Sequence, residues 1–141
     1  MTEKSVNYWV VLFLRVALGM IFFSMGFTKV FIIGIVPYAE TNFVEAYAGT
    51  WLPGPLLWVA GIIDPIVLLV GGILLILGLF TSWTCIGCGL MMMMIFFGHL
   101  VADPFTDFTS HPLPYLAMIL FILYLEPKGN RISIDGIIKK K

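Results

Sequence analysis

Long apolar runs limit the possible folds of this chain more than any other feature. They occupy residues 9–31, 56–80, 83–101 and 113–125 and contain few charged side chains. At 1.5 Å per residue, about 20 apolar residues cross a bilayer core of about 30 Å. Because the runs are continuous and lack the alternation of barrel strands, they predict helices. We therefore expect one all-α integral membrane domain over residues 1–141, a bundle of four transmembrane helices.

The composition supports a membrane location and excludes other classes. Of the 141 residues, 60% are hydrophobic and 11% are charged, whereas roughly a quarter are charged in a soluble domain. A soluble globular protein is excluded, and the expected environment is the lipid bilayer. Eight basic and eight acidic residues cancel, so nothing in the net charge indicates a nucleic-acid partner.

The segment 32–55, between the first two apolar runs, is mixed in character. It contains two acids and three prolines. Phe43, Tyr47 and Trp51 recur every four residues, which is the spacing of one helix face. We expect a short interfacial helix here, between the first and second spanning helices.

Basic residues are concentrated near the two ends of the chain. Four spanning helices would bring both ends to one side of the membrane. That side carries six of the eight basic residues: Lys4, Lys128, Arg131, Lys139, Lys140 and Lys141. Because short cytoplasmic segments are enriched in Lys and Arg, both termini are predicted to be cytoplasmic.

Polar residues on the inward stripes of the runs are the candidate site. Seven-residue spacing places Arg15 and Lys29 on one glycine-rich stripe, and Asp64, Leu68 and Gly71 on a second. A third stripe, which begins at Cys85 and Cys88, contains His99. Asp64 lies roughly 13 Å from the end of its run, and a carboxylate at that depth costs about 2.5–3.5 kcal/mol. We expect Asp64 to face protein and Lys29 to reach toward it. Asp64, His99 and Lys29 are the candidate catalytic residues.

Each of these residues also has an ordinary structural explanation. Lys29 can extend its amine to the membrane surface, and His99 can be a structural residue at a helix end. Arg15 can extend toward the cytoplasmic side, or bind a buried partner or an anionic headgroup. Burial of Asp64 is equally compatible with a structural ion pair.

The sulfur-containing residues predict no metal site. Cys85 and Cys88 form a CxxC pair on the predicted cytoplasmic side, where thiols stay reduced. Inert buried thiols are the preferred interpretation, and a redox pair is the alternative. A structural zinc site is not expected, because CxxC alone has too few ligands. The four methionines at 91–94 would point in directions about 100° apart on a helix, so they cannot converge on one copper ion.

Three strings resemble a known family. They are LRVALGMIFFSMGFTKVF, which contains Arg15 and Lys29, VGGILLILGLFT at 70–81, and GNRISID near the end of the chain. Together, in this order, they resemble the DoxX family of bacterial and archaeal four-helix membrane proteins. The chain departs from the family in having Asp64 where a glutamate is usual, and Ser82 and Trp83 where an arginine is frequent.

The resemblance implies a cytoplasmic (inner) membrane of a bacterium or archaeon and several functions. Some relatives are membrane subunits of thiosulfate:quinone oxidoreductase, and others belong to oxidative-stress complexes. The first hypothesis is therefore a subunit of a quinone-linked redox system. In it Asp64 and His99 exchange protons with a quinol headgroup, while Phe22, Trp58 and Arg15 help to bind the quinone.

Two other classes of function remain open. A non-catalytic subunit that assembles or stabilises a larger membrane complex needs only the glycine stripes, the aromatic segment and paired polar groups. A carrier for a small solute or lipid would use the same buried charges, but four helices are few for alternating access, so it would have to oligomerise. The expected protein partners are other membrane subunits or further copies of the chain.

Overall fold

The computed structural model describes residues 3–103 and 112–129, and every regular element in these ranges is helical. In chain order the elements are α1 (Glu3–Phe27), the π-helix η1 (Thr28–Gly34), α2 (Ile35–Ala39), the π-helix η2 (Glu40–Glu45), α3 (Gly54–Leu77), α4 (Thr81–Ala102) and α5 (Pro112–Gly129).

Most of this helical structure is long and apolar. Within the described ranges, the stretches Val6–Glu45, Gly54–Leu77 and Thr81–Ala102 are long and apolar enough to cross a membrane, and Pro112–Leu125 is a shorter apolar stretch. The prediction of an all-helical membrane bundle is confirmed at this level. The number of spans, and the position of the segment before α3 at a membrane surface, stay predictions.

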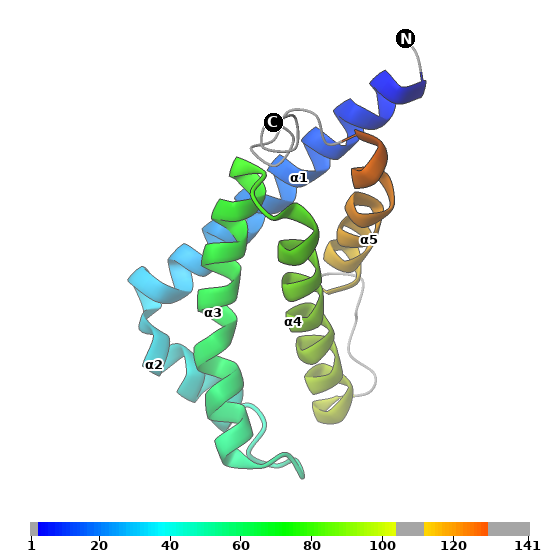
Figure 1. Cartoon of the computed structure of the whole chain (residues 1–141). Helices are drawn as coiled ribbons and strands as arrows, with labels where there is room; N and C mark the ends of the chain where they lie inside the picture. The colour runs from blue at the N-terminus through cyan, green and yellow to red at the C-terminus, as the bar shows by residue number, and fades with distance from the viewer. Residues whose placement is uncertain (1–2, 104–111, 130–141) are drawn as a thin grey trace.

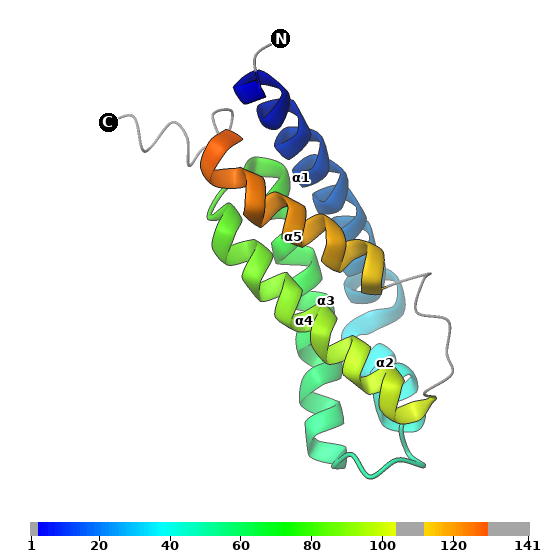
Figure 2. The same ribbon diagram turned by 90° about the vertical axis from the view of Figure 1, so that its right-hand side faces the viewer.

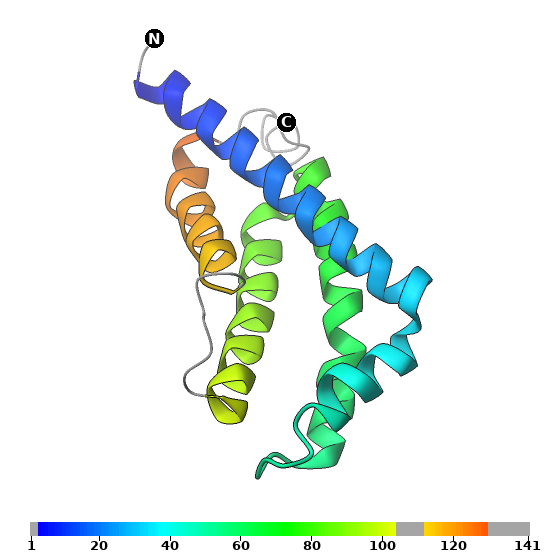
Figure 3. The same cartoon turned by 180° about the vertical axis from the view of Figure 1, so that it is seen from behind.

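The long helices alternate in direction (Figure 1). The start of α1, the turn between α3 and α4, and the end of α5 lie at one end of the bundle, while α2, the start of α3 and the end of α4 lie at the other. Helix α1 crosses α3, as Figure 3 shows from behind, and α5 packs against both α1 and α4 (Figure 2). This arrangement brings α1, α3 and α4 around one interior.

Glycines let α1 and α3 approach closely where they cross. A methyl group on Gly26 would overlap the Leu69 backbone, and one on Gly72 would overlap the Phe23 backbone. An added Cβ on Gly19 would lie 3.0 Å from the Gly72 carbonyl oxygen. Such backbone contact is typical of small-residue helix pairs in membranes. The two glycine-rich stripes predicted from the sequence therefore meet each other.

The stripes predicted by seven-residue spacing are buried. Arg15 is 3% exposed and Asp64 is fully buried. The main apolar cluster joins four helices, with these buried members: Leu18, Phe22, Leu68, Leu75, Cys85, Cys88, Met92, Ile119 and Ile122. Met91 and Met92 are buried while Met93 is exposed, as expected for consecutive residues that pack in different directions.

The turn between α3 and α4 differs from the expected one. The gap between the apolar runs 56–80 and 83–101 predicted a tight turn at Thr81 and Ser82, but both residues already belong to α4. Helix α3 ends at Leu77, and Gly78 follows with φ 69°. Gly78 donates its N–H to the Leu75 carbonyl, which closes the helix end in the way that glycine favours. The sequence is apolar on both sides of Gly78, so hydropathy alone did not mark this turn.

The segment between α1 and α3 first runs away from α3 and then folds back, so that α2 and η2 pack against α3. Gly34, with φ 92°, separates η1 from α2, a backbone conformation suited to glycine. Beyond it, Phe43 and Tyr47 are buried, whereas Trp51 is 73% exposed and contacts Phe97 edge to face. The expected helix face of three aromatic residues is therefore not formed, because η2 ends at Glu45 and both Tyr47 and Trp51 lie beyond it.

Candidate functional site

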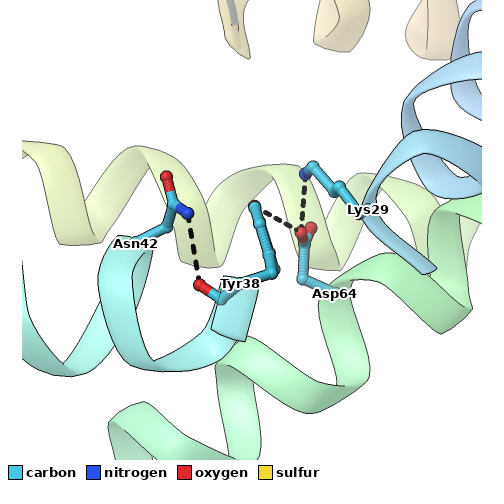
Figure 4. A network of polar contacts seen from close by, with 4 residues as sticks. All are labelled: Lys29, Tyr38, Asn42 and Asp64. Atoms are coloured by element: carbon cyan, nitrogen blue, oxygen red, sulfur yellow. Dashed lines mark hydrogen bonds and ion pairs between the residues drawn. The ribbon is translucent and has the colours of Figure 1, made fainter. Parts of the chain in front are cut away.

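An ion pair between α3 and η1 is the central feature of the candidate site (Figure 4). The Lys29 Nζ lies 2.7 Å from Oδ2 of Asp64. The Asp64 side chain is fully buried and that of Lys29 is 14% exposed. The expectation that Lys29 reaches toward Asp64 is confirmed.

Close backbone packing brings α2 to the same point. A Cβ added to Gly61 would lie 2.8 Å from the Cα of Ala39, so glycine at position 61 allows α2 to lie directly on α3. Gly61 precedes Asp64 by one turn and Ala39 follows Tyr38. The contact therefore holds the Tyr38 side chain beside the carboxylate.

Tyr38 is the third member of the site, and the sequence analysis missed it. Its hydroxyl donates to Oδ2 of Asp64 at 3.0 Å, and the Lys29 Nζ lies 4.6 Å from the centre of its ring. Asn42 Nδ2 donates to the Tyr38 backbone carbonyl at 3.2 Å. Figure 4 shows Lys29 and Tyr38 reaching Asp64 from two separate segments. Two donors thus converge on one oxygen of a buried carboxylate.

The pairing makes the buried charges tolerable. An isolated charge inside a membrane protein is costly, whereas a matched pair with further hydrogen bonds recovers much of that cost. Lys29 and Asp64 together carry no net charge. The second oxygen of Asp64, Oδ1, has no hydrogen-bond partner in the described part of the chain. The site is therefore neutral overall and retains one buried acceptor.

A cavity of about 400 Å³ adjoins the Lys29 side of this ion pair. Six lining residues have side chains with a polar group: Lys29, Tyr38, Asn42, Tyr47, His99 and Tyr115. The remaining lining residues are apolar or glycine: Met25, Phe43, Leu52, Leu56, Leu57, Ala60, Met92, Met94, Ile95, Phe97, Gly98 and Pro112. Asp64 is not part of the lining, so Lys29 and Tyr38 separate it from the cavity.

A match to a family model decides the relationship of the chain. The model of the DoxX family matches residues 10–100. The chain belongs to the DoxX family. No curated protein and no solved structure matches it significantly. The segment matched by the DoxX model contains the ion pair, Tyr38 and His99, but ends before the two lining residues from α5, Pro112 and Tyr115.

Of the other residues predicted for the site of this DoxX protein, one lines the cavity and three do not. His99 lines the cavity, in the last turn of α4. Phe22 is fully buried and packs edge to face against the Tyr115 ring at 5.9 Å. Trp58 is half-buried in α3, and Arg15 is buried in α1. Phe22, Trp58 and Arg15 are not among the lining residues. The structure therefore pairs Lys29 with Asp64 and places Lys29 and His99 on one cavity, but it does not bring these three residues to it.

The Tyr47 hydroxyl is held against α4. A Cβ on Gly98 would lie 3.1 Å from this hydroxyl, so glycine leaves the room that Tyr47 occupies. Burial raises the pKa of Tyr47 above its ordinary value. The hydroxyl therefore stays protonated near neutral pH and lines the cavity as a neutral group.

Both cysteines are buried, and neither forms a disulfide. An added Cβ on Gly71 would lie 2.5 Å from the Cys88 Sγ, so the thiol packs directly against the α3 backbone. Neither cysteine is a lining residue of the cavity. Their surroundings match those of structural thiols.

Proposed function

We propose that this DoxX protein is a small membrane subunit of a quinone-linked redox system, similar in role to the membrane subunit of thiosulfate:quinone oxidoreductase. One observation carries the proposal. An apolar cavity of about 400 Å³ has a cationic lining group, Lys29. Its charge is neutralised by Asp64, which lies outside the lining. The quinone-linked relatives that family membership implies support the same class of ligand.

The cavity suits a neutral ligand with a flat headgroup. Its volume falls in the range of ordinary small-molecule sites, roughly 300–1,000 Å³. Because Asp64 already compensates Lys29, a neutral ligand needs no counter-charge. An anion, in contrast, would compete with Asp64 for the Lys29 amine. The apolar residues of the lining provide the surface that a quinone ring and tail require.

The polar groups of the lining define what the protein contributes. A bound quinone would supply two-electron, two-proton redox chemistry. Lys29 has N–H groups beyond the one that contacts Asp64, and these can donate to a headgroup oxygen. The His99 imidazole, which also lines the cavity, has ring nitrogens that can hydrogen-bond to a headgroup oxygen. Asp64 acts through Lys29 and Tyr38, because it does not itself line the cavity.

The same proposal includes a topology and partners. We infer four spanning segments, formed by α1 with η1, α3, α4 and α5, with α2 and η2 near the outer surface of a bacterial or archaeal cytoplasmic membrane. The start of α1 and the end of α5 lie at one end of the bundle (Figure 1), which supports termini on one side of the membrane. The concentration of basic residues near the two ends of the sequence supports the cytoplasmic side. A second redox subunit or a further copy of the chain is the expected partner.

Quinone binding tests the proposal. The purified full-length protein in lipid nanodiscs should bind a short-chain benzoquinone with a measurable Kd by equilibrium dialysis. The double variant Lys29→Met, Asp64→Asn is neutral and keeps an acceptor for Tyr38, so it should fold. It should bind the quinone at least about tenfold more weakly, since it loses the amine donor.

A control variant outside the cavity isolates the site. Glu45→Gln removes an exposed acid of η2 that is not part of the lining, and it should bind as the wild type does. If the wild-type protein binds no quinone, the proposal fails and a non-catalytic assembly role becomes the better hypothesis. If the double variant binds as tightly as the wild type, the ion pair does not form the site.

A further inference from the structure

The direction of the hydrogen bond between Tyr38 and Asp64 has a chemical consequence for the cavity. An ionised carboxylate has no hydrogen to donate, and Asp64 is paired with the Lys29 amine. The Tyr38 hydroxyl must therefore be the donor, and its only hydrogen is directed at Oδ2 of Asp64. What Tyr38 can offer to a cavity ligand is the lone-pair side of its oxygen.

Lys29 offers the opposite capacity. Its amine carries three hydrogens and no acceptor, and one hydrogen contacts Asp64. The others can donate equally well to a carbonyl oxygen or to a hydroxyl oxygen. Lys29 therefore cannot distinguish an oxidised headgroup from a reduced one.

The other polar lining groups, Asn42, Tyr47, His99 and Tyr115, are similarly unselective. An amide and a neutral imidazole each have both a donor and an acceptor, and a tyrosine hydroxyl without a carboxylate partner can rotate to either role. In the described part of the chain, no hydrogen bond of the Tyr47 hydroxyl is recorded. Only Tyr38 has its donor held by a buried carboxylate.

We infer that Tyr38 is a specificity-determining residue that makes this cavity prefer a hydroxyl-bearing headgroup over its carbonyl-bearing form. The inference rests on the proposed function and adds to it that the preferred ligand is the reduced hydroquinone. A hydroquinone O–H can donate to the Tyr38 oxygen. A quinone carbonyl oxygen and the Tyr38 oxygen are both acceptors, so no hydrogen bond can form between them.

Comparing two redox forms of one ligand tests the inference. Duroquinone and durohydroquinone are titrated without oxygen into the full-length protein in lipid nanodiscs. The wild type should bind durohydroquinone about tenfold more tightly, the effect of one hydrogen bond whose partners would otherwise stay unpaired. Tyr38→Phe should reduce this ratio to about one, mainly by weakening hydroquinone binding.

Tyr47→Phe is the matched control. It removes another hydroxyl from the same cavity, but one that can either donate or accept. Affinity for both forms should fall together and the ratio should stay near ten. A ratio that is lost equally in Tyr47→Phe and Tyr38→Phe would overturn the assignment to Tyr38.

A third ligand keeps the test independent of any variant. The dimethyl ether of durohydroquinone has the ring of the reduced form without its O–H donors. On the wild type it should bind no more tightly than duroquinone. Tight binding of the ether, or equal binding of quinone and hydroquinone, overturns the inference while the proposed quinone site stands. Failure of all three ligands to bind overturns the proposed function itself.

Discussion

The two halves of the bundle are built in different ways. The closed half, next to the α3–α4 turn, has fully buried apolar side chains: Leu18, Leu75, Cys85, Cys88 and Ile122. The cavity half, at the other end, has an ion pair between Lys29 and Asp64 and a hollow of about 400 Å³. Glycine serves both halves, since Gly26 and Gly72 join α1 to α3 and Gly61 joins α2 to α3.

The path of the chain explains how the cavity half makes room for its hollow. Next to the closed half α1 crosses α3 in direct backbone contact. In the cavity half the chain departs through η1, turns at Gly34 and returns through α2 and η2 (Figure 3). π-helical turns are rare and are often found at functional sites. Here the two π-helices flank α2, and Lys29 and Tyr38 reach Asp64 from separate directions. Both side chains line the cavity.

The largest effect should come from separating the charges of the cavity half. Asp64→Asn leaves the Lys29 amine without a counter-charge, and breaking a buried pair typically costs about 3–5 kcal/mol. The free energy of unfolding, measured by detergent titration, should fall by that amount. Adding Lys29→Met removes the stranded charge and should restore stability to within about 1 kcal/mol of the wild type. An Asp64→Asn protein as stable as the wild type would show that the pair is not buried.

A smaller effect is expected from crowding the α1–α3 crossing. Gly26→Ala inserts a methyl group into the Leu69 backbone, and overpacking of this kind costs about 1–3 kcal/mol. Gly87→Ala on α4 is the control, because a Cβ there meets no heavy atom within 4 Å. It should be neutral or slightly stabilising, since alanine favours the helix. Equal losses in the two variants would contradict the close crossing.

The smallest effect should be a local one in the cavity half. Gly34→Ala forces a side chain onto a backbone with φ 92°, which costs roughly 1–2 kcal/mol. Hydrogen–deuterium exchange should become faster in α2 and η2 while the middle of α4 stays protected. Gly49→Ala, where an added Cβ meets nothing within 4 Å, should leave exchange unchanged. Uniformly faster exchange would mean that the two halves unfold together.

Much of the fold could be predicted because helix periodicity carries over to packing. Seven-residue spacing placed Asp64, Leu68 and Gly71 on one inward face of α3, and all three are buried. The meeting of Lys29 and Asp64 followed from that face and from the reach of the lysine side chain. The glycine stripes were also correctly predicted, but they join helices of the same chain, whereas one hypothesis used them to bind other subunits.

Other parts could not be predicted, for identifiable physical reasons. Tyr38 lies between two π-helices, where the regular period is interrupted and no stripe connects it with Asp64. Phe22 was expected to line an apolar slot, but aromatic type alone cannot distinguish a cavity wall from a packed core, and here it packs against Tyr115. The position of the α3–α4 turn depended on the left-handed conformation of Gly78, one of several glycines in an apolar run.

Photoaffinity mapping tests the central claim most directly, namely that the cavity half is a quinone site. An azidoquinone is photolysed with the wild-type protein in lipid nanodiscs, with and without excess unlabelled quinone, and the labelled peptides are sequenced. We predict competable labelling on residues that line the cavity, in the segment from Tyr38 to Tyr47 and at Ile95 to His99. Labelling confined to the closed half around Leu18, or labelling that excess quinone does not reduce, would contradict the claim.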